Sequence, residues 1–229
     1  MSPTTAVVDI DGTLIDSNYH HALAWSRAFS DVDRSVPLWR IHRAIGMGGD
    51  QLVAAVTDEY FAAQHGAAAR DRHARHYAEL VGEVRVLPGA REFLIGLADA
   101  GAAVVLASSA QEEEVQHAVE LLDAATVVNG WTTAADVDRT KPDPQLIQRA
   151  LTIAGCDPAA AVLIGDSSWD MDAGRAAGVA LIGVLSGGFS AGELLDHGAE
   201  AVFPSVAEIE IEDGPGGLTM PCLRAGASG

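Results

Sequence analysis

The sequence predicts an α/β protein with a doubly wound, Rossmann-like parallel sheet and an inserted α-helical cap domain. Short apolar runs alternate with helix-spaced segments in most of the chain, and one long internal segment shows only helical spacing. With 229 residues, 48% of them apolar, the chain can form one or two domains with a core. The predicted organisation is an α/β core at residues 1–16 and 84–213, a helical cap at 17–83 and a disordered tail at 214–229.

The strands follow from runs of β-branched and other apolar residues. The first run, at residues 5–10, ends in two aspartates. Later runs are separated by segments of helical spacing, which indicates that successive strands lie parallel. Their carboxyl ends then share one edge of the sheet, where ligands bind in such folds. We expect the later strands at residues 102–107, 125–129, 160–165, 179–184 and 199–203.

The internal segment at residues 17–83 contains no strand-like run, and its apolar residues recur at the spacing of one helix face. Glycine and proline are unfavourable inside helices, so they mark the expected boundaries. Breaks near Pro37, at residues 46–49 and at Gly66 divide the segment into about four helices.

Two carboxylates, Asp9 and Asp11, stand at the end of the first strand, directly before Gly12. Residues two apart in a strand project to the same side, so both side chains can face one site. Like charges held this close repel one another unless a cation or a shared proton offsets them. Mg²⁺, which prefers oxygen ligands, is the simplest such cation. The alternative is a strand that runs into an Asx-type turn.

Three further segments place polar side chains after an apolar run or in a turn. Ser108 and Ser109 follow a strand-like run, where they can cap the next helix or bind an anion. Lys141, the only lysine among 14 Lys and Arg residues, lies in a Thr-Lys-Pro-Asp-Pro turn. Asp166 follows another apolar run, and Asp170 lies on the same face if a helix begins there. Asp170 is then either a metal-directed carboxylate or an acid favoured by the helix dipole.

These segments, in this order, resemble the four motifs of the haloacid dehalogenase superfamily, over residues 5–210. The first motif of that family is DxDGT before an apolar residue, and its fourth has the GDxxxD form found at residues 165–170. The resemblance is closest to the helical-cap subfamily and its phosphoglycolate phosphatase-like branch. It implies that the helical segment covers the sheet edge that carries the site.

The resemblance also implies a role for each motif residue. Asp9 is the expected nucleophile, and Asp11 the general acid and then the general base. The hydroxyl of Ser108 and the amide of Ser109 are expected to bind the phosphoryl group, and Lys141 to stabilise its charge. The expected Mg²⁺ ligands are Asp9, the backbone carbonyl of Asp11, Asp166 and Asp170, the last directly or through a water.

Substrate contacts are expected from the helical segment. Its glycine-rich stretch resembles the specificity loop of this cap type, although a plain connection between helices is the alternative. Arg43 can meet an anionic substrate or lie on a solvated helix face. His21 can contact substrate or serve as a packing residue at the hinge. The predicted substrate-binding residues are Ser109, Gly46, Met47, Gly48, Gly49, Asp50, Gln51, His21 and Arg43.

The function implied by the resemblance is a Mg²⁺-dependent phosphatase that hydrolyses a small soluble phosphate monoester through an aspartyl-phosphate intermediate. A β-phosphoglucomutase-like sugar phosphomutase is the alternative enzyme, but such mutases carry a Glu-Asp pair where this chain has Gly165 and Asp166. The dehalogenases themselves lack the second aspartate of the first motif. A phosphoacceptor signalling domain is a third alternative, disfavoured because such domains are shorter and lack a cap.

The amino-acid composition limits which classes of partner the protein is expected to bind. A net charge of −18 argues against nucleic acid, whose binding proteins carry basic faces. No apolar run is long enough for a membrane span, no signal peptide is apparent, and Cys156 and Cys222 suggest no disulfide framework. We therefore expect a cytoplasmic monomer or homodimer that acts on a small phosphorylated metabolite, without a membrane or nucleic-acid partner.

Overall fold

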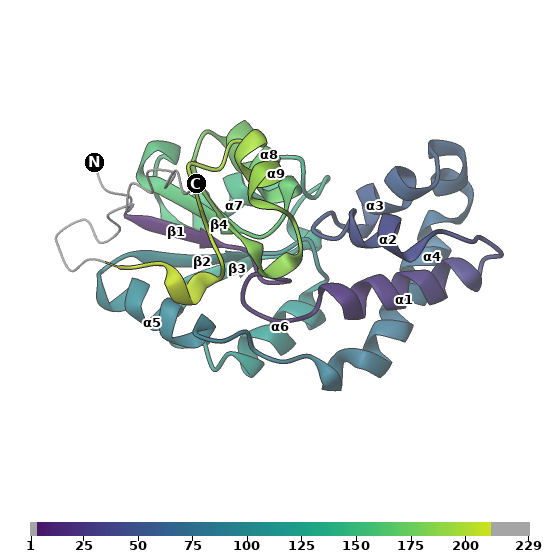
Figure 1. Ribbon diagram of the computed structural model, residues 1–229, viewed down its shortest axis with the longest axis horizontal. Coiled ribbons are helices and arrows are strands. Elements are labelled where there is room, and N and C mark those ends of the chain that lie inside the picture. Colours follow the sequence, from purple (N-terminus) through teal and green to yellow (C-terminus); the bar gives the residue numbers. More distant parts are fainter. Residues whose placement is uncertain (1–3, 212–229) are drawn as a thin grey trace, which may run out of the picture.

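Six strands form one parallel sheet in the order β3-β2-β1-β4-β5-β6 in the computed structural model, which describes residues 4–211 (Figure 1). The predicted doubly wound α/β fold is confirmed. The tail predicted at 214–229 lies outside the described residues. The strands are β1 Thr5–Val8, β2 Ala103–Ala107, β3 Gly130–Thr132, β4 Ala161–Gly165, β5 Ala180–Val184 and β6 Ala201–Phe203.

The order of the strands reverses at β1, which has β2 on one side and β4 on the other. Val8 at the end of β1 is in register with Leu106 of β2 and Ile164 of β4. Such a reversal leaves a crevice at the carboxyl ends of the strands, where ligands bind. Asp9 and Asp166, which directly follow β1 and β4, therefore lie at this crevice.

Helices cover both faces of the sheet (Figure 1). An apolar cluster on one face includes Leu94 and Val115, and a second cluster on the other includes Ile147 and Met171. The helices are α5 Ala90–Asp99 and α6 Glu112–Leu121 on the first face, and α7 Gln145–Ala154, α8 Ser168–Ala177 and α9 Ala191–Asp196 on the second. Short 3₁₀ helices span Val81–Glu83, Ala134–Asp136, Pro158–Ala160, Leu185–Gly187 and Val206–Glu208.

Four helices follow β1 in the chain and lie together beyond the carboxyl edge of the sheet (Figure 1). We call them the insert. They pack around an apolar cluster of their own that includes Trp25, Phe29 and Leu52. The insert therefore presents a separately packed body to the edge that carries the acidic residues. Its helices are α1 Asn18–Ser30, α2 Leu38–His42, α3 Gly49–Val56 and α4 Glu59–Leu80.

The strand predicted at residues 125–129 is wrong, because β3 begins at Gly130. The N–H groups of Val127 and Val128 both donate to the carbonyl of Ala124 and close a turn there. Two β-branched residues therefore end a helix–strand connection instead of starting the strand.

The helix break predicted at Gly66 is also wrong, because α4 runs through this residue. The helix begins after Asp58, whose side chain accepts a hydrogen bond of 2.8 Å from the Phe61 N–H. A helical glycine costs only about 1 kcal/mol relative to alanine, which the packing of a long helix can offset.

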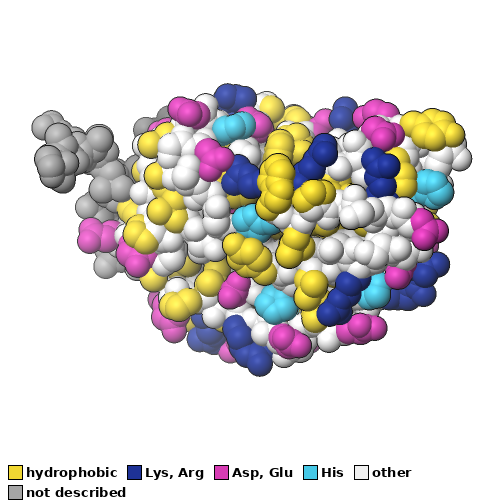
Figure 2. All heavy atoms as spheres, turned by 45° about the vertical axis from the view of Figure 1, so that its right-hand side comes forward, with side chains coloured by type: hydrophobic (Ala, Val, Ile, Leu, Met, Phe, Trp, Pro, Cys, Tyr) yellow, Lys and Arg dark blue, Asp and Glu magenta, His cyan; other side chains and the backbone are white. Residues whose placement is uncertain are grey.

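No helix within residues 4–211 combines the length and the apolar composition needed to cross a membrane. Figure 2 shows the insert side of the molecule, where acidic and basic side chains are interspersed and apolar side chains gather along the middle. Exposed large apolar residues include Tyr19, Leu38 and Trp39. The mixed charge on this face differs from the continuous basic surface of nucleic-acid-binding proteins.

Candidate active site

A threonine links the two acidic strand ends. Thr13 Oγ1 lies 3.2 Å from Asp9 Oδ2 and 3.2 Å from Asp166 Oδ1, so its single proton can go to either carboxylate. The turn that returns this hydroxyl to the strand end depends on Gly12, which has a φ of 81°. Asp9 and Asp166 are both buried, with 4% and 1% exposure. The DxDGT segment therefore builds a buried floor that joins β1 to β4.

The only lysine of the chain is fully buried in this floor. Lys141 Nζ lies 2.5 Å from Asp9 Oδ1, 2.7 Å from Asp170 Oδ1 and 2.6 Å from the carbonyl oxygen of Ala107. The contacts with Asp9 and Ala107 are hydrogen bonds, and the contact with Asp170 is an ion pair. In this arrangement Lys141 fixes the orientation of Asp9.

Asp170 occupies the first turn of α8. Its Oδ2 accepts hydrogen bonds from the Ser167 hydroxyl at 2.5 Å and the Ser167 N–H at 3.1 Å, which is the reciprocal pattern of a capping box. Its Oδ1 faces Lys141. Asp170 is thus a helix-terminal acid that also holds the lysine, and direct ligation of a metal stays a prediction.

The acidic cluster carries more negative charge than its contacts offset. Carboxylate oxygens of Asp9, Asp166 and Asp170 lie within 4.8 Å of one another, and Lys141 is the one Lys or Arg in ion-pair contact with them within residues 4–211. Burial, and next the charge of Asp170, raises the pKa of Asp9 from 3.8 to about 7. Burial and the neighbouring carboxylates raise the pKa of Asp166 well above its ordinary value. A buried set of carboxylate oxygens with unbalanced charge fits Mg²⁺.

Asp11 points away from this floor toward the insert. Its Oδ1 accepts a hydrogen bond of 2.5 Å from the Ser17 hydroxyl and lies 3.2 Å from His21 Nε2. Its Oδ2 lies 3.4 Å from the Ser108 hydroxyl. Burial raises the pKa of Asp11, but His21 and Ser17 outweigh burial and leave that pKa below its ordinary value. The two aspartates of the first motif thus have different surroundings.

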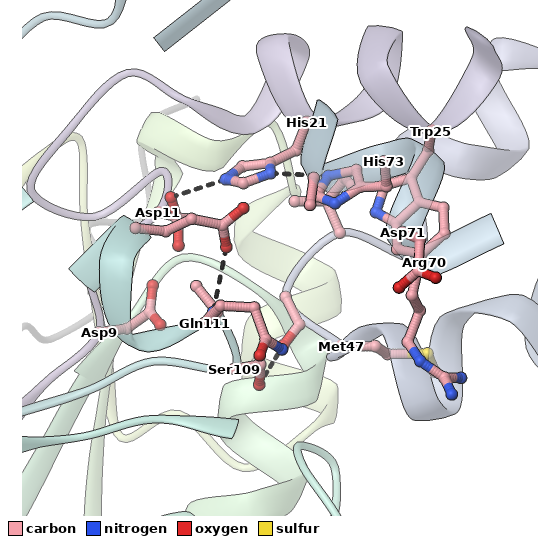
Figure 3. A pocket seen from close by; sticks show the side chains of 15 residues that line it. Asp9, Asp11, His21, Trp25, Met47, Arg70, Asp71, His73, Ser109 and Gln111 are labelled. Atoms are coloured by element: carbon pink, nitrogen blue, oxygen red, sulfur yellow. Dashed lines mark hydrogen bonds and ion pairs between the residues drawn. The ribbon is translucent and has the colours of Figure 1, made fainter. Parts of the chain in front are cut away.

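A cavity of about 270 Å³ lies between the sheet edge and the insert. Figure 3 shows Asp9 and Asp11 at one end of it, and Arg70 and Met47 at the other. Of the residues predicted to bind substrate, those that line it are Gly46, Met47, His21 and Ser109. Side chains that sequence reasoning missed also line it, among them Arg70, Asp71, His73 and Glu114.

The other half of the glycine-rich loop contacts the third motif. The Gly48 N–H donates to Thr140 Oγ1 at 3.0 Å, and the Asp50 carboxylate accepts from the Thr140 N–H at 3.1 Å and from its hydroxyl. Gly48, Gly49, Asp50 and Gln51 are not among the residues that line the cavity. This part of the loop therefore joins the insert to the residue that precedes Lys141.

Arg43 does not reach the cavity. Its guanidinium pairs with Glu193 at 2.5 Å and lies over the ring of Phe189, 3.9 Å from its centre. Its carbonyl oxygen accepts a hydrogen bond from Trp169 Nε1 at 3.0 Å. The structure thus places Arg43 in a contact between α2 and the helices after β4 and β5.

Asn18, which sequence reasoning also missed, braces Asp166. Its Nδ2 donates to Asp166 Oδ2 at 2.9 Å and to the carbonyl oxygen of Gly187 at 3.4 Å. A Cβ at Gly187 would lie 1.5 Å from that carboxylate oxygen, so no other residue fits there. The run of polar residues from Asp16 to Asn18, where α1 begins, was the available signal for Asn18.

Comparisons with known proteins agree with this architecture. Residues 6–184 match the family described as haloacid dehalogenase-like hydrolase. The phosphoglycolate phosphatase of Pseudomonas putida is 30% identical over 207 residues, which are 85% of this chain and 73% of that protein. A plasmid phosphoglycolate phosphatase of Cupriavidus necator is 29% identical over 210 residues, 89% of this chain and 90% of that protein.

A solved structure shows the same fold at similar identity. The crystal structure of a hydrolase from Pseudomonas syringae has a TM-score of 0.85 and 31% identity, and the match covers 90% of this chain and 95% of that one. The family match spans the four segments that meet at the carboxyl edge of the sheet, and the protein therefore belongs to the haloacid dehalogenase-like hydrolases.

Proposed function

We propose that this protein is a Mg²⁺-dependent phosphatase that hydrolyses a small phosphate monoester through an aspartyl phosphate on Asp9. The observation that carries this proposal is the contrast between its two first-motif aspartates. Asp9 is held at the cavity floor by Lys141, whereas Asp11 faces the cavity from beside it. This contrast supports Asp9 as the group that attacks phosphorus and Asp11 as the group that exchanges a proton with the leaving oxygen.

The reaction has two steps. A carboxylate oxygen of Asp9 forms a bond to phosphorus while the ester P–O bond breaks, and Asp11 passes to the departing oxygen the proton that it shares with His21, whose Nε2 lies 3.2 Å away. Water then attacks the phosphorus of the aspartyl phosphate, its proton goes to Asp11, and inorganic phosphate and the Asp9 carboxylate are released. Mg²⁺, held by Asp9, Asp166 and the backbone carbonyl of Asp11, would supply positive charge for the phosphoryl oxygens.

We further propose that the substrate carries a second anionic group, as 2-phosphoglycolate does. Arg70 is the only Lys or Arg among the described residues that line the cavity, and within residues 4–211 it has no carboxylate at ion-pair distance. It stands at the opposite end from Asp9 and Asp11 (Figure 3). A small ester can therefore place its phosphate at the floor and a carboxylate near Arg70. The names of the sequence relatives support this choice.

The test of the proposed function is phosphate release. Purified protein with Mg²⁺ should release inorganic phosphate from 2-phosphoglycolate in step with substrate consumption, and excess chelator should stop it. Water labelled with heavy oxygen should deliver its label to the phosphate. Conversion of β-glucose 1-phosphate to glucose 6-phosphate, faster than phosphate release, would instead support the phosphomutase.

Arg70→Gln should weaken recognition of an anionic leaving group. A hydrogen bond to a charged group contributes about 1.5–3 kcal/mol, so KM for 2-phosphoglycolate should rise by roughly 10- to 100-fold. KM for p-nitrophenyl phosphate should change little. Arg72→Gln is the matched control, because Arg72 lies on the same helix but faces Asp31. Equal effects of Arg70→Gln on both substrates would rule out a specific contact.

Mg²⁺ should stabilise the fold more at high pH than at low pH. The pKa of Asp9 is raised from 3.8 to about 7 in the folded state. The contribution of Asp9 to folding stability is therefore fully present below pH 3.8 and is lost as the pH rises through about 7, where the buried carboxyl must ionise. The melting temperature in chelator should therefore fall between pH 4 and pH 8, and Mg²⁺ should reverse the fall.

Thermal unfolding at a series of pH values, with Mg²⁺ and with chelator, measures this effect. Asp166→Asn removes one buried charge, so the chelated variant should melt at a higher temperature than the chelated wild type at pH 8. A stabilisation by Mg²⁺ that is equal at every pH would show that the acidic cluster does not hold the ion.

A further inference from the structure

Two histidines form a chain of contacts that ends on the proposed proton donor. His21 Nε2 lies 3.2 Å from Asp11 Oδ1, and His21 Nδ1 lies 3.1 Å from His73 Nε2 (Figure 3). Asp11 follows β1, His21 belongs to α1, and His73 lies on the long helix α4. Both histidines are buried and line the cavity. The chain therefore connects the catalytic loop to the far helix of the insert.

The two rings face each other as partners in an N–H···N hydrogen bond. Their planes differ by 18° and their centres are 5.3 Å apart, close to the N···N distance plus the two ring radii. Burial lowers the pKa of His73 well below its ordinary value, so the ring is neutral near pH 7 and one nitrogen can accept. His73 Nε2 then accepts a hydrogen bond from the N–H group at His21 Nδ1.

Aromatic stacking keeps both rings in place. His73 stacks on Trp25 with ring centres 4.3 Å apart, and His21 stacks on Tyr77 at 3.9 Å. Trp25 and Tyr77 are themselves buried, with 4% exposure each. Neither imidazole can turn without breaking a stack and a hydrogen bond, so the contact at one end of the chain fixes the ring at the other.

A metal held by the two histidines is the alternative. His21, His73 and Glu114 each offer a ligand atom within 4.8 Å of the others. Two imidazole ligands of one ion must direct their lone pairs to a common point, whereas these nitrogens point at each other across 3.1 Å. The Glu114 carboxylate is also already bound to the backbone N–H of Gln111 at 3.1 Å. The hydrogen-bonded arrangement fits the geometry better.

We propose that His73 is a positioning residue for proton transfer to the leaving group, acting through His21. By accepting from His21 Nδ1, it keeps His21 Nε2 on Asp11 Oδ1 and so fixes the direction of the Asp11 carboxyl. This role rests on the proposed phosphatase function. His73 lies in α4, 62 positions after Asp11 in the chain, so the proposed role connects two distant parts of the sequence.

The test compares two substitutions on two substrates. His73→Phe keeps an aromatic ring on Trp25 but removes the acceptor, and His73→Gln restores an acceptor at a similar reach. The quantity measured is kcat/KM, which reports the steps up to departure of the leaving group. An alkyl alkoxide needs the proton from Asp11, whereas p-nitrophenolate leaves without it.

His73→Phe should lower kcat/KM for 2-phosphoglycolate by roughly 10- to 100-fold, with less than about a threefold change for p-nitrophenyl phosphate. His73→Gln should recover most of the loss. His76→Leu is the matched control, because His76 lies one turn further on and contacts Asp31. Nitrogen-15 NMR should show the His21 Nδ1–H resonance in the wild type and in His73→Gln, and its loss in His73→Phe.

The outcomes separate the two proposals. If the wild type hydrolyses neither ester, the phosphatase function fails, and this role with it. If the wild type is active but His73→Phe loses the same factor on both esters, or His73→Gln recovers nothing, only the positioning role is overturned.

Discussion

Replacing Asp9 with asparagine is expected to lower turnover by about 10⁴-fold or more, because the amide keeps the shape of the carboxylate but cannot attack phosphorus. The change also removes one carboxylate from the set proposed to hold Mg²⁺. The Michaelis constant should move far less than kcat, since Arg70 and the cavity walls remain. Steady-state kinetics with 2-phosphoglycolate at saturating Mg²⁺ measures both quantities.

Two controls make this result specific. Asp16→Asn changes an exposed aspartate in the same loop and should leave turnover within about twofold, as expected for surface substitutions. Thermal unfolding in chelator at pH 8 should show that Asp9→Asn is no less stable than the wild type, because it removes a buried charge. Turnover above one-hundredth of the wild-type value in pure Asp9→Asn protein would show that another group is the nucleophile.

The sheet and its acidic edge could be predicted because both depend on local sequence. The runs before Asp9, Ser108 and Asp166 are apolar on both faces of the sheet, as expected for strands buried between helices. The polar residue that ends each run then marks the carboxyl edge. Because the strands pair in parallel, these ends meet at one edge of the sheet. This can be predicted without knowing how distant helices pack.

The far wall of the cavity could not be predicted in this way. Arg43 looked suitable because it stands next to the glycine-rich loop, yet it packs against Phe189 and pairs with Glu193. The cavity instead receives Arg70 and His73 from α4. Which face of α4 meets the cavity depends on how that helix packs on α1, and spacing within α4 alone does not determine it.

The contacts of Asp170 and Ser108 bear on two roles that the sequence left open. Asp170 was open between a helix-terminal acid and a metal-directed group. Its Oδ2 accepts from Ser167, whereas its buried Oδ1 has no hydrogen-bond partner among the described residues and lies 2.7 Å from the Lys141 ammonium. Ser108 was open between a cap and a phosphoryl contact. It accepts from the Ala110 N–H at 3.0 Å while its own proton faces Asp11. A cap and a catalytic contact are compatible in one hydroxyl, because it can accept and donate at once.

Lys141→Met is expected to have the second largest effect, on stability and on turnover together. Removing the ammonium leaves Asp9 and Asp170 buried without a cation, and breaking such a pair costs about 3–5 kcal/mol. Turnover should fall by at least about 100-fold, because Asp9 loses the group that holds its Oδ1. Urea unfolding at pH 8 in chelator and turnover with Mg²⁺ measure the two effects. Wild-type values for either would contradict the assignment.

A double substitution separates charge from positioning. Lys141→Met with Asp170→Asn removes one carboxylate along with the ammonium, so about half of the lost stability should return, whereas turnover should not. Asp170→Asn alone is the matched control. Lys141→Arg should also lose turnover, because the larger, planar guanidinium does not fit the fully buried position of the ammonium between Asp9, Asp170 and the Ala107 carbonyl. That requirement for a compact cation accounts for a lysine at this position in a chain that otherwise uses arginine.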